Sequence, residues 1–334
     1  MRKTICLASL LAIFFSACGK KEEKPAPKPL PVIGFVQAVE DETINDARRG
    51  FLDALKAGGF DSGKVVIDYQ NAQNDIPTLN QILDRFIAKK VTLIAANTTI
   101  AMVTALSKTK DIPIFMMVAP PPTINNLAEV DSLGRNVREP RNLSGVYETL
   151  TYIDSNLALI KRVFPKAKKI GVIYNPSEVN STNAMGRLRP LSKQYGFALE
   201  ERAIDATINV PPAAQSLVNA KIDVFFAPPD NVVFSAFETI VKTMNAANIP
   251  IVTSEADLVK RGAAFGYGAD FYQWGYQCGE MVASFLKEKP DTTGASLREL
   301  GYPLQVVKVR KFVHNDEALA RFGLKAPEGS VAVK

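Results

Sequence analysis

Residues 169–181 read Lys169-Ile170-Gly171-Val172-Ile173-Tyr174-Asn175-Pro176-Ser177-Glu178-Val179-Asn180-Ser181. A short apolar run is followed by a polar turn and then by an amphipathic stretch that continues to residue 195. An apolar run without polar alternation is typical of a strand that is covered by helices on both faces. A strand followed by a helix is one half of a βαβ unit, and such units build parallel sheets with right-handed crossovers.

The same unit recurs along the chain from residue 32 onward. The first set of expected strands is Val32–Gln37, Val65–Asn71, Val91–Asn97 and Ile114–Val118, and its helices are Asn45–Ala57, Ile76–Lys89 and Thr99–Lys108. The second set of strands is Lys169–Asn175, Leu199–Asp205, Asp223–Ala227, Ile251–Ser254 and Ala264–Gly268, and its helices are Ser181–Tyr195, Pro211–Asn219, Val232–Asn248 and Phe271–Lys287. Between them the pattern breaks at Pro140 and Gly145. The sequence therefore predicts an α/β protein with two doubly wound parallel-sheet lobes joined by a hinge near residue 145.

The N-terminus has the three parts of an export signal. Arg2 and Lys3 precede an apolar run of 11 residues, Ile5–Phe15, which is too short to span a bilayer. Ser16 and Ala17 are followed by Cys18, and this order resembles a bacterial lipobox with Phe15 in place of the usual leucine. We expect residues 1–17 to be a signal peptide, Cys18 to be acylated, for example with palmitate, and the charged, proline-rich residues 18–31 to be a tether. The alternative is a plain signal peptide with an incidental cysteine.

The composition excludes several classes of protein. The formal net charge is +6, but the N-terminal lysines and arginines supply most of it, so no concentrated basic face favours nucleic acid. Cys278 is the one cysteine beyond the N-terminal segment, which makes an internal disulfide impossible and suggests a small buried apolar residue. The sequence contains none of the common nucleotide-binding, metalloprotease or serine-hydrolase motifs, and it has one histidine, His314. We therefore expect no enzyme activity, no cofactor and no metal.

Polar loops follow the predicted strands, and they supply the candidate site. Ligands of parallel sheets bind at the carboxyl ends of the strands. If two such lobes face each other, the loops at these strand ends should meet in a cleft between the lobes. Each residue alone fits a helix cap, since Ser, Thr, Asn and Asp are the commonest N-caps, so the prediction depends on their convergence. The expected ligand-binding residues are Glu40, Asn97, Thr98, Thr99, Tyr147, Asn175, Ser177, Glu178, Asn180, Ser181, Asp230, Asn231, Glu255 and Asp270.

Several of these stretches resemble one family, the ABC-transporter substrate-binding lipoproteins that include tryptophan- and tyrosine-binding members. The resemblance lies in residues 68–75, in residues 171–181, in Pro229-Asp230-Asn231 and in residues 266–275. It implies the type I periplasmic binding protein fold, in which the chain crosses the hinge three times. With that crossing pattern, lobe 1 should comprise residues 32–145 and 263–294, and lobe 2 should comprise residues 146–262 and 295–334. Residues 98–100 and 118–122, at the lobe 1 edge, depart from the family pattern.

The sequence and the resemblance together predict a monomeric receptor outside the cytoplasm, anchored by lipid to a bacterial membrane, that delivers a small ligand to the permease of an ABC importer. The ligand is expected to be an amino acid with an aromatic side chain. Its carboxylate should lie near Thr98, Thr99 and Ser177, and its ammonium near Asp230, which is favoured over Glu178. The side chain should contact Tyr147, Tyr174, Phe271 or the prolines at 120–122. The alternatives are a receptor for a nucleoside or a sugar, an exported enzyme that uses cleft carboxylates, and a sensory module that presents its ligand to a membrane kinase.

Overall fold

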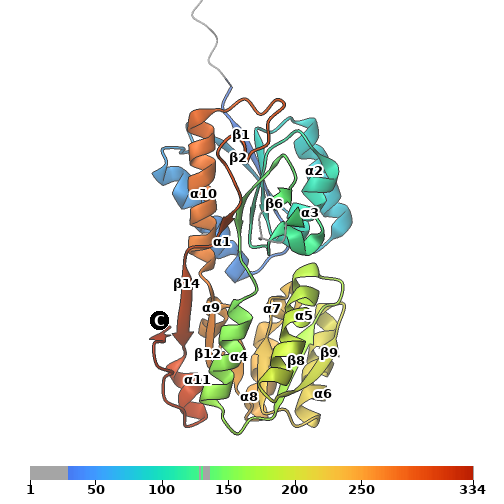
Figure 1. Cartoon of the computed structure of the whole chain (residues 1–334), viewed down its shortest axis with the longest axis vertical. Coiled ribbons are helices and arrows are strands. Elements are labelled where there is room, and N and C mark those ends of the chain that lie inside the picture. The colour runs from blue at the N-terminus through green and yellow to red at the C-terminus, as the bar shows by residue number, and fades with distance from the viewer. Residues whose placement is uncertain (1–28, 128, 131–135, 334) are drawn as a thin grey trace, which may run out of the picture. The chain divides into compact units, whose positions relative to one another are not determined.

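The computed structural model describes residues 29–127, 129–130 and 136–333, and Figure 1 shows their arrangement. The predicted signal peptide, Cys18 and most of the predicted tether lie outside the described residues. From Pro31 to Lys334 the chain forms one compact unit, which contains two sheets. None of the helices in the described ranges combines the length and the apolar character that a bilayer span requires.

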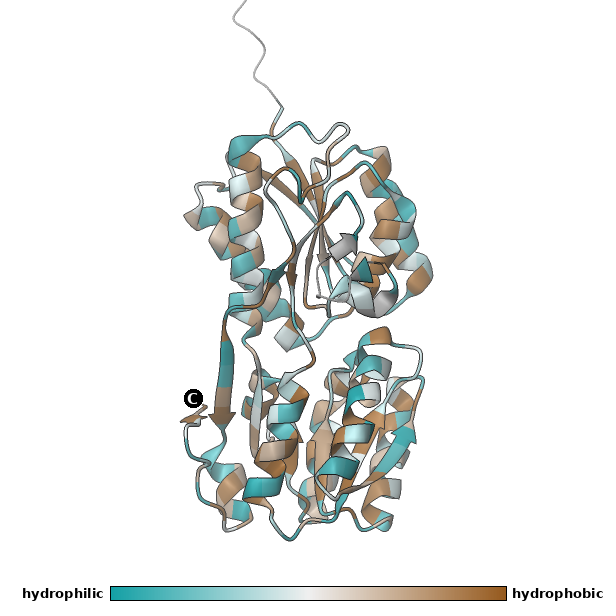
Figure 2. Ribbon diagram, in the orientation of Figure 1, coloured by the Kyte–Doolittle hydropathy of each residue, from teal (hydrophilic) through white to brown (hydrophobic). Residues whose placement is uncertain are grey.

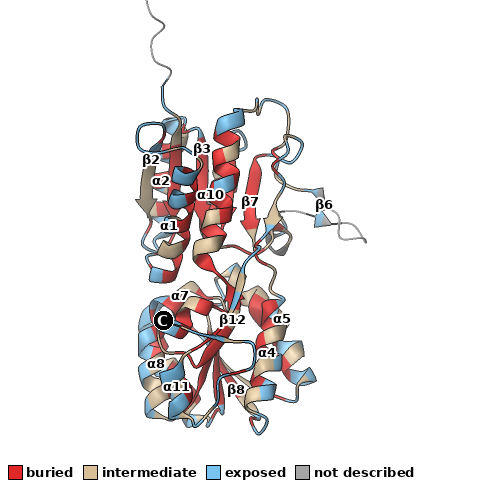
Figure 3. Ribbon diagram, turned by 90° about the vertical axis from the view of Figure 1, so that its left-hand side faces the viewer, coloured by how far each residue is buried: buried red, intermediate tan, exposed pale blue. Residues whose placement is uncertain are grey.

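Lobe 1 is built on a six-stranded parallel sheet with the order β13-β7-β4-β3-β1-β2. Its strands are β1 (Val32–Gln37), β2 (Val66–Asn71), β3 (Leu93–Asn97), β4 (Ile114–Met117), β7 (Leu143–Tyr147) and β13 (Gln305–Val306). Its helices are α1 (Glu42–Ala57), α2 (Ile76–Ala88), α3 (Thr99–Lys108), the short 3₁₀ helix η1 (Pro122–Asn125) and α10 (Phe271–Glu288). Two further short strands, β5 (Glu129–Val130) and β6 (Asn136–Arg138), pair antiparallel with each other. The central strands are buried, as Figure 3 shows in red, because helices cover both faces of the sheet.

Lobe 2 is built on a seven-stranded sheet with the order β15-β14-β12-β11-β10-β8-β9, in which β12 and β14 form the one antiparallel pair. Its strands are β8 (Lys169–Tyr174), β9 (Ala198–Ala203), β10 (Val224–Ala227), β11 (Ile251–Thr253), β12 (Phe265–Ala269), β14 (Arg310–His314) and β15 (Val331–Ala332). Its helices are α4 (Tyr152–Val163), α5 (Val179–Gln194), the 3₁₀ helix η2 (Thr207–Asn209), α6 (Val210–Asn219), α7 (Asn231–Ser235), α8 (Phe237–Ala246), α9 (Ala256–Lys260) and α11 (Asp316–Arg321). The expectation of two doubly wound α/β lobes is confirmed.

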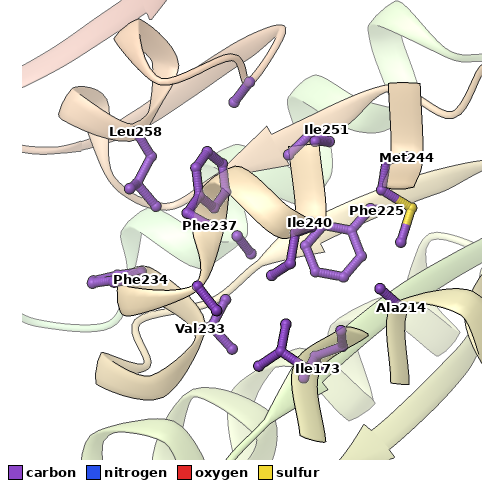
Figure 4. Packing of buried hydrophobic residues seen from close by; sticks show 14 of the residues in the cluster. Ile173, Ala214, Phe225, Val233, Phe234, Phe237, Ile240, Met244, Ile251 and Leu258 are labelled. Carbon is purple, nitrogen blue, oxygen red and sulfur yellow. The ribbon is translucent and has the colours of Figure 1, made fainter. Parts of the chain in front are cut away.

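Apolar side chains of strands and helices meet on each face of the sheets. In lobe 2, Phe225 of β10 and Ile251 of β11 pack against Phe237 and Ile240 of α8 (Figure 4). Figure 2 shows the same division on the ribbon, with brown on the strands and teal along the solvent side of many helices. In lobe 1, Cys278 is buried in the core cluster, where desolvation raises the pKa of its thiol. The cysteine is therefore a buried core residue, as its surroundings in the sequence indicate.

The lobe boundaries differ from those expected. Strand β12, expected in lobe 1, pairs with β11 in lobe 2, because the chain completes this strand before it crosses at Asp270. Strand β13, expected in lobe 2, pairs with β7 in lobe 1. The chain therefore crosses the hinge at residues 148–151, at Asp270 and at residues 307–309.

Gly145 belongs to β7 and does not end lobe 1. Its φ is +121°, and a Cβ placed on it would lie 2.2 Å from the carbonyl oxygen of Met116 on the neighbouring strand. The glycine that interrupts the apolar pattern is thus required by a close approach of two backbones inside the sheet.

Helix α10 packs on α1 through glycines that leave no room for a side chain. A Cβ on Gly275 would lie 1.8 Å from the carbonyl oxygen of Ala47, and a Cβ on Gly50 would lie 1.9 Å from the carbonyl oxygen of Tyr272. The backbones of the two helices are therefore in direct contact over this stretch.

Replacing Gly275 with alanine is expected to lower the free energy of unfolding by about 1–3 kcal/mol, because the added methyl group forces two packed helices apart. Denaturant titration measures this loss. Gly186→Ala in α5 is the matched control, since its Cβ would meet nothing within 4 Å and alanine is the better helix former. An unchanged free energy of unfolding for Gly275→Ala would contradict the close packing of α1 and α10.

Candidate functional site

A pocket lies where the carboxyl ends of the strands of both sheets face each other, and we call it the cleft pocket. The residues that line it come from both lobes and from the first hinge crossing. They are Thr98, Thr99, Val118, Ala119, Pro120, Glu148, Leu150, Tyr152, Asn180, Pro229, Asn231, Phe234, Glu255, Phe271 and Trp274.

The lobe 1 side of the cleft pocket presents the first turn of α3. Thr98 has a φ of +98°, which is unusual for a β-branched residue, and its buried Oγ1 atom has no hydrogen-bond partner among the described residues. Thr99 begins the helix, whose first N–H groups have no partner within the helix. Behind them, Asn97 donates through Nδ2 to the carbonyl oxygen of Ile44 at 3.2 Å. A hydroxyl and free N–H groups at a helix start are suited to hold a carboxylate.

Two buried carboxyl groups also line the cleft pocket. Glu148 in the first hinge crossing accepts two hydrogen bonds from Arg310, at 2.8 and 2.6 Å. Glu255, at the end of β11, is 3% exposed, and its Oε2 atom has no partner within the described ranges. Desolvation, followed by the charges of Glu148 and Asp257, raises the pKa of Glu255 well above its usual range. The pocket therefore contains one carboxyl group that lacks a cation.

Aromatic side chains form the apolar wall of the cleft pocket. Phe271 and Trp274 of α10 pack edge to face with ring centroids 5.6 Å apart. The indole Nε1 of Trp274 donates to the carbonyl oxygen of Val146 at 2.8 Å, which fixes the ring at the hinge. Tyr152 and Phe234 add two buried rings from lobe 2. Such a wall is suited to contact the apolar part of a ligand.

The structure brings part of the predicted site together. Thr98, Thr99, Asn180, Asn231 and Glu255 line the cleft pocket, and Asn97 is buried directly before Thr98. The other predicted residues do not line the pocket. They are Glu40, Tyr147, Asn175, Ser177, Glu178, Ser181, Asp230 and Asp270.

Several of these residues have structural contacts instead. The exposed Glu40 accepts a hydrogen bond from Asn45 at 2.7 Å and another from Asn71. The side chain of Asp270 caps α10 and forms an ion pair with Lys311 at 2.6 Å. Ser177 is exposed, and Tyr147, which ends β7, packs on an apolar cluster of lobe 1.

Asp230, which is expected to lie near the ligand ammonium, has other partners in this structure. Its carboxylate is completely buried, and its Oδ1 atom accepts the N–H of Val233 at 2.9 Å. Its Oδ2 atom accepts the N–H of Asn175 at 2.6 Å and the hydroxyl of Ser181 at 2.7 Å. Both oxygens are therefore occupied, and Asp230 joins the starts of α5 and α7 behind the pocket.

Glu178 lies beside this network and is likewise surrounded by donors. Its Oε2 atom accepts hydrogen bonds from the backbone of Asn231 at 3.1 Å, from the side chain of Asn231 at 2.8 Å and from Asn180 at 3.3 Å. Desolvation, together with the charge of Asp230, raises the pKa of Glu178 to about 7. The residue orients two amides that line the pocket, although it does not line the pocket itself.

Four residues that line the cleft pocket were not predicted from the sequence, namely Glu148, Tyr152, Phe234 and Trp274. The signal for Glu148 was present, since it directly follows strand β7, and polar residues after strands were the criterion. Gly145 and Pro140 concealed that strand because they were interpreted as breaks in the pattern.

The chain matches the family model described as ABC transporter substrate binding protein over residues 32–333. A curated relative, the tyrosine-binding protein of Clostridioides difficile (strain R20291), is 37% identical over 276 residues, which are 82% of this chain and 78% of the relative. A solved ABC domain from Streptococcus pneumonia in complex with L-Trp is 25% identical with a TM-score of 0.80, and the match covers 91% of this chain and 100% of that one.

A second solved structure is the ligand-free, open form of a substrate-binding protein with adhesive properties from Clostridium difficile. It is 34% identical with a TM-score of 0.66, and the match covers 91% of this chain and 99% of that one. The matched family binds solutes and is not a family of enzymes. The chain belongs to the ABC-transporter substrate-binding protein family, with the type I periplasmic binding protein fold.

Proposed function

We propose that this protein is the lipid-anchored receptor of an ABC importer and that it binds an α-amino acid with an aromatic side chain in the cleft pocket. One observation carries the proposal: the pocket holds two buried polar atoms, the hydroxyl oxygen of Thr98 and the carboxyl oxygen Oε2 of Glu255, and neither has a partner among the described residues. The carboxylate of an amino acid supplies a partner for Thr98 and the start of α3. Its ammonium supplies a partner for Glu255.

The apolar wall supports an aromatic side chain as the third part of the ligand. Phe271, Trp274 and Tyr152 offer ring faces and edges, and Pro120 and Pro229 face the pocket from the two lobes. Aromatic pairs add about 0.5–1.5 kcal/mol beyond the burial of their area. Two relatives also support an aromatic amino acid as the ligand: one is described as a tyrosine-binding protein, and the other was solved in complex with L-Trp.

Closure of the two lobes around the ligand is the mechanism that we propose. Arg261, which follows α9 in lobe 2, forms an ion pair at 3.0 Å with Asp41, the N-cap of α1 in lobe 1. The chain also superposes better on the relative with bound L-Trp than on the open relative, although the open one is more similar in sequence. Both observations support an arrangement near that of a ligand-bound protein. A ligand that contacts both lobes binds the closed state more tightly and shifts the population toward it.

Calorimetric titration with free amino acids, sugars and nucleosides tests the proposal. We expect binding of L-tyrosine or L-tryptophan and none of glucose or adenosine. Binding of a sugar or a nucleoside, without binding of any amino acid, would replace the proposal with the receptor for another solute.

The affinity for the amino acid is expected to fall as the pH falls. In the free protein, Glu255 has a raised pKa, so it holds a proton at pH values where an ordinary carboxyl group is ionised. The ligand ammonium favours the ionised form and lowers this pKa, so binding releases a proton. Affinity should therefore drop up to tenfold for each pH unit below the pKa of the free protein, until the pKa of the complex is reached. Calorimetric titrations at a series of pH values measure this dependence. An affinity that does not fall as the pH is lowered would contradict it.

The anchor is a separate part of the proposal and depends on Cys18, which lies outside the described residues. Replacing Cys18 with serine should release the protein from membranes, because the acylated thiol is the proposed attachment. Several acyl chains anchor stably, whereas one chain binds only marginally. Membrane fractionation and palmitate labelling measure the effect. A Cys18→Ser variant that stays in the membrane fraction with unchanged labelling would contradict the assignment.

A further inference from the structure

An ion pair connects the two lobes beside the cleft pocket. Asp41 caps the start of α1 in lobe 1, and Arg261 follows α9 in lobe 2. Nη1 of Arg261 donates to Oδ2 of Asp41 at 3.0 Å. The side chain of Asp41 is 4% exposed and that of Arg261 is 13% exposed. The pair is therefore largely removed from water, although its two members belong to different lobes.

Both members of the pair are connected to residues that line the pocket. Nη2 of Arg261 donates to the carbonyl oxygen of Phe234 at 2.7 Å, and Phe234 lines the pocket from lobe 2. In lobe 1, Ile44 in the first turn of α1 packs in one apolar cluster with Phe271, which lines the pocket from the other lobe. A separation of Asp41 from Arg261 therefore moves the two walls of the pocket apart.

Each member of the pair is also held within its own lobe. Nε and Nη2 of Arg261 donate to the two carboxylate oxygens of Glu238 at 2.7 and 3.1 Å, and the guanidinium carbon lies 5.5 Å from the ring centroid of Phe237. Such a bidentate contact fixes the orientation of the guanidinium. In lobe 1, Oδ1 of Asp41 accepts the N–H of Thr43 at 2.9 Å. The ion pair can therefore break and form again without a change inside either lobe.

We infer that Asp41 and Arg261 form a latch that keeps the protein closed in the absence of ligand and slows the release of the ligand. The inference rests on the proposed function, because it requires the lobes to close around the ligand. The pair is made in the closed state and lost in the open state, and such a difference in contacts between two states shifts the equilibrium between them. Interaction energies between residues in contact correspond here to a shift of about 5- to 30-fold.

A latch differs in its kinetics from a residue that contacts the ligand. The ligand enters and leaves through the open state, since the pocket lies between the lobes. Loss of the latch raises the open fraction of the ligand-free protein, so association becomes faster, and it eases the opening of the complex, so dissociation becomes faster too. Kd, the ratio of the two rate constants, therefore rises less than the dissociation rate constant does. Loss of a ligand contact instead changes mainly the dissociation rate.

The experiment combines small-angle X-ray scattering of the ligand-free proteins with stopped-flow binding of L-tyrosine. Trp274 is the one tryptophan of the chain and lines the cleft pocket, so its fluorescence, excited where only tryptophan absorbs, reports binding. The proteins to compare are the unaltered protein, Asp41→Asn, Arg261→Gln, the double variant and the control Glu42→Gln. Asparagine keeps the helix cap. Glu42 is exposed in the first turn of the same helix and forms no ion pair within the described ranges.

Asp41→Asn should have a larger radius of gyration without ligand than the unaltered protein has. It should release L-tyrosine about 5- to 30-fold faster and also bind it faster. Glu42→Gln should match the unaltered protein. The double variant should release L-tyrosine no faster than Arg261→Gln does, because both substitutions remove the same pair. Denaturant titration should give nearly the same free energy of unfolding for Asp41→Asn and the unaltered protein, since the pair lies between the lobes.

An unchanged radius of gyration for ligand-free Asp41→Asn overturns the inference. Faster dissociation of this variant without faster association also overturns it, and so does a double variant in which the effects of the two substitutions add. If no amino acid binds to the unaltered protein, the proposed function itself fails, whereas the scattering of the ligand-free proteins still decides whether the pair holds the lobes together.

Discussion

Replacing Glu255 with glutamine is expected to weaken the binding of the aromatic amino acid by about 2–4 kcal/mol, which is roughly 30- to 1000-fold. The carboxylate is buried and has an oxygen without a partner, so it is the one carboxyl group of the cleft pocket that lacks a cation. Glutamine fills the same space but leaves the ligand ammonium without a counter-charge. The effect should appear as a higher Kd in calorimetric titration.

The same substitution should leave folding intact or improve it. A buried carboxyl group without a cation destabilises the ligand-free protein, and a neutral amide removes that cost. Glu317→Gln, at an exposed position of α11, is the matched control and should change neither affinity nor stability. An unchanged Kd for Glu255→Gln would show that the ammonium lies elsewhere.

Replacing Asp230 with alanine is expected to lower the free energy of unfolding by about 3–5 kcal/mol. The substitution leaves the buried hydroxyl of Ser181 and the N–H groups of Asn175 and Val233 without their acceptor. Each orphaned donor costs about 1–3 kcal/mol, and the three donors come from two separate segments of lobe 2. Denaturant titration measures the loss.

Asp75→Ala is the matched control for this prediction. Asp75 also caps a helix through its side chain, with 2.7 Å to the N–H of Thr78, but it is exposed. Its loss should therefore cost about 1 kcal/mol. If Asp230→Ala unfolds like the unaltered protein but no longer binds amino acids, Asp230 is the ammonium ligand that the sequence predicts.

Most strands of both lobes could be predicted, because a strand that is buried on both faces is a short run of apolar residues without polar alternation. Residues 32–37, 169–174 and 224–227 are short apolar runs, and each forms a strand where it was expected. Strand β7 was missed for a specific reason. Gly145 is required by the close backbone of Met116, and a glycine forced by tertiary contact cannot be told from a turn glycine in the sequence alone.

The loops of the site could be predicted, but the roles of individual acids could not. Asp230 and Glu255 each lie between the end of a buried strand and the start of a helix, and the sequence offers no reason to distinguish them. Ser181 and Asn175, about 50 residues earlier, donate to Asp230. Glu255 has only a long hydrogen bond from Ser254 at 3.4 Å, and its Oε2 atom has no partner among the described residues. Whether a buried carboxylate is satisfied is decided by packing between segments that are distant in the chain.

A crystal structure of the protein with L-tyrosine or L-tryptophan tests the central claim most directly. The account predicts that the ligand lies in the cleft pocket, with its ammonium within about 3 Å of Glu255 and its carboxylate at Thr98 and the first turn of α3. A ligand bound elsewhere, or bound in the pocket with its ammonium away from Glu255, would contradict the account.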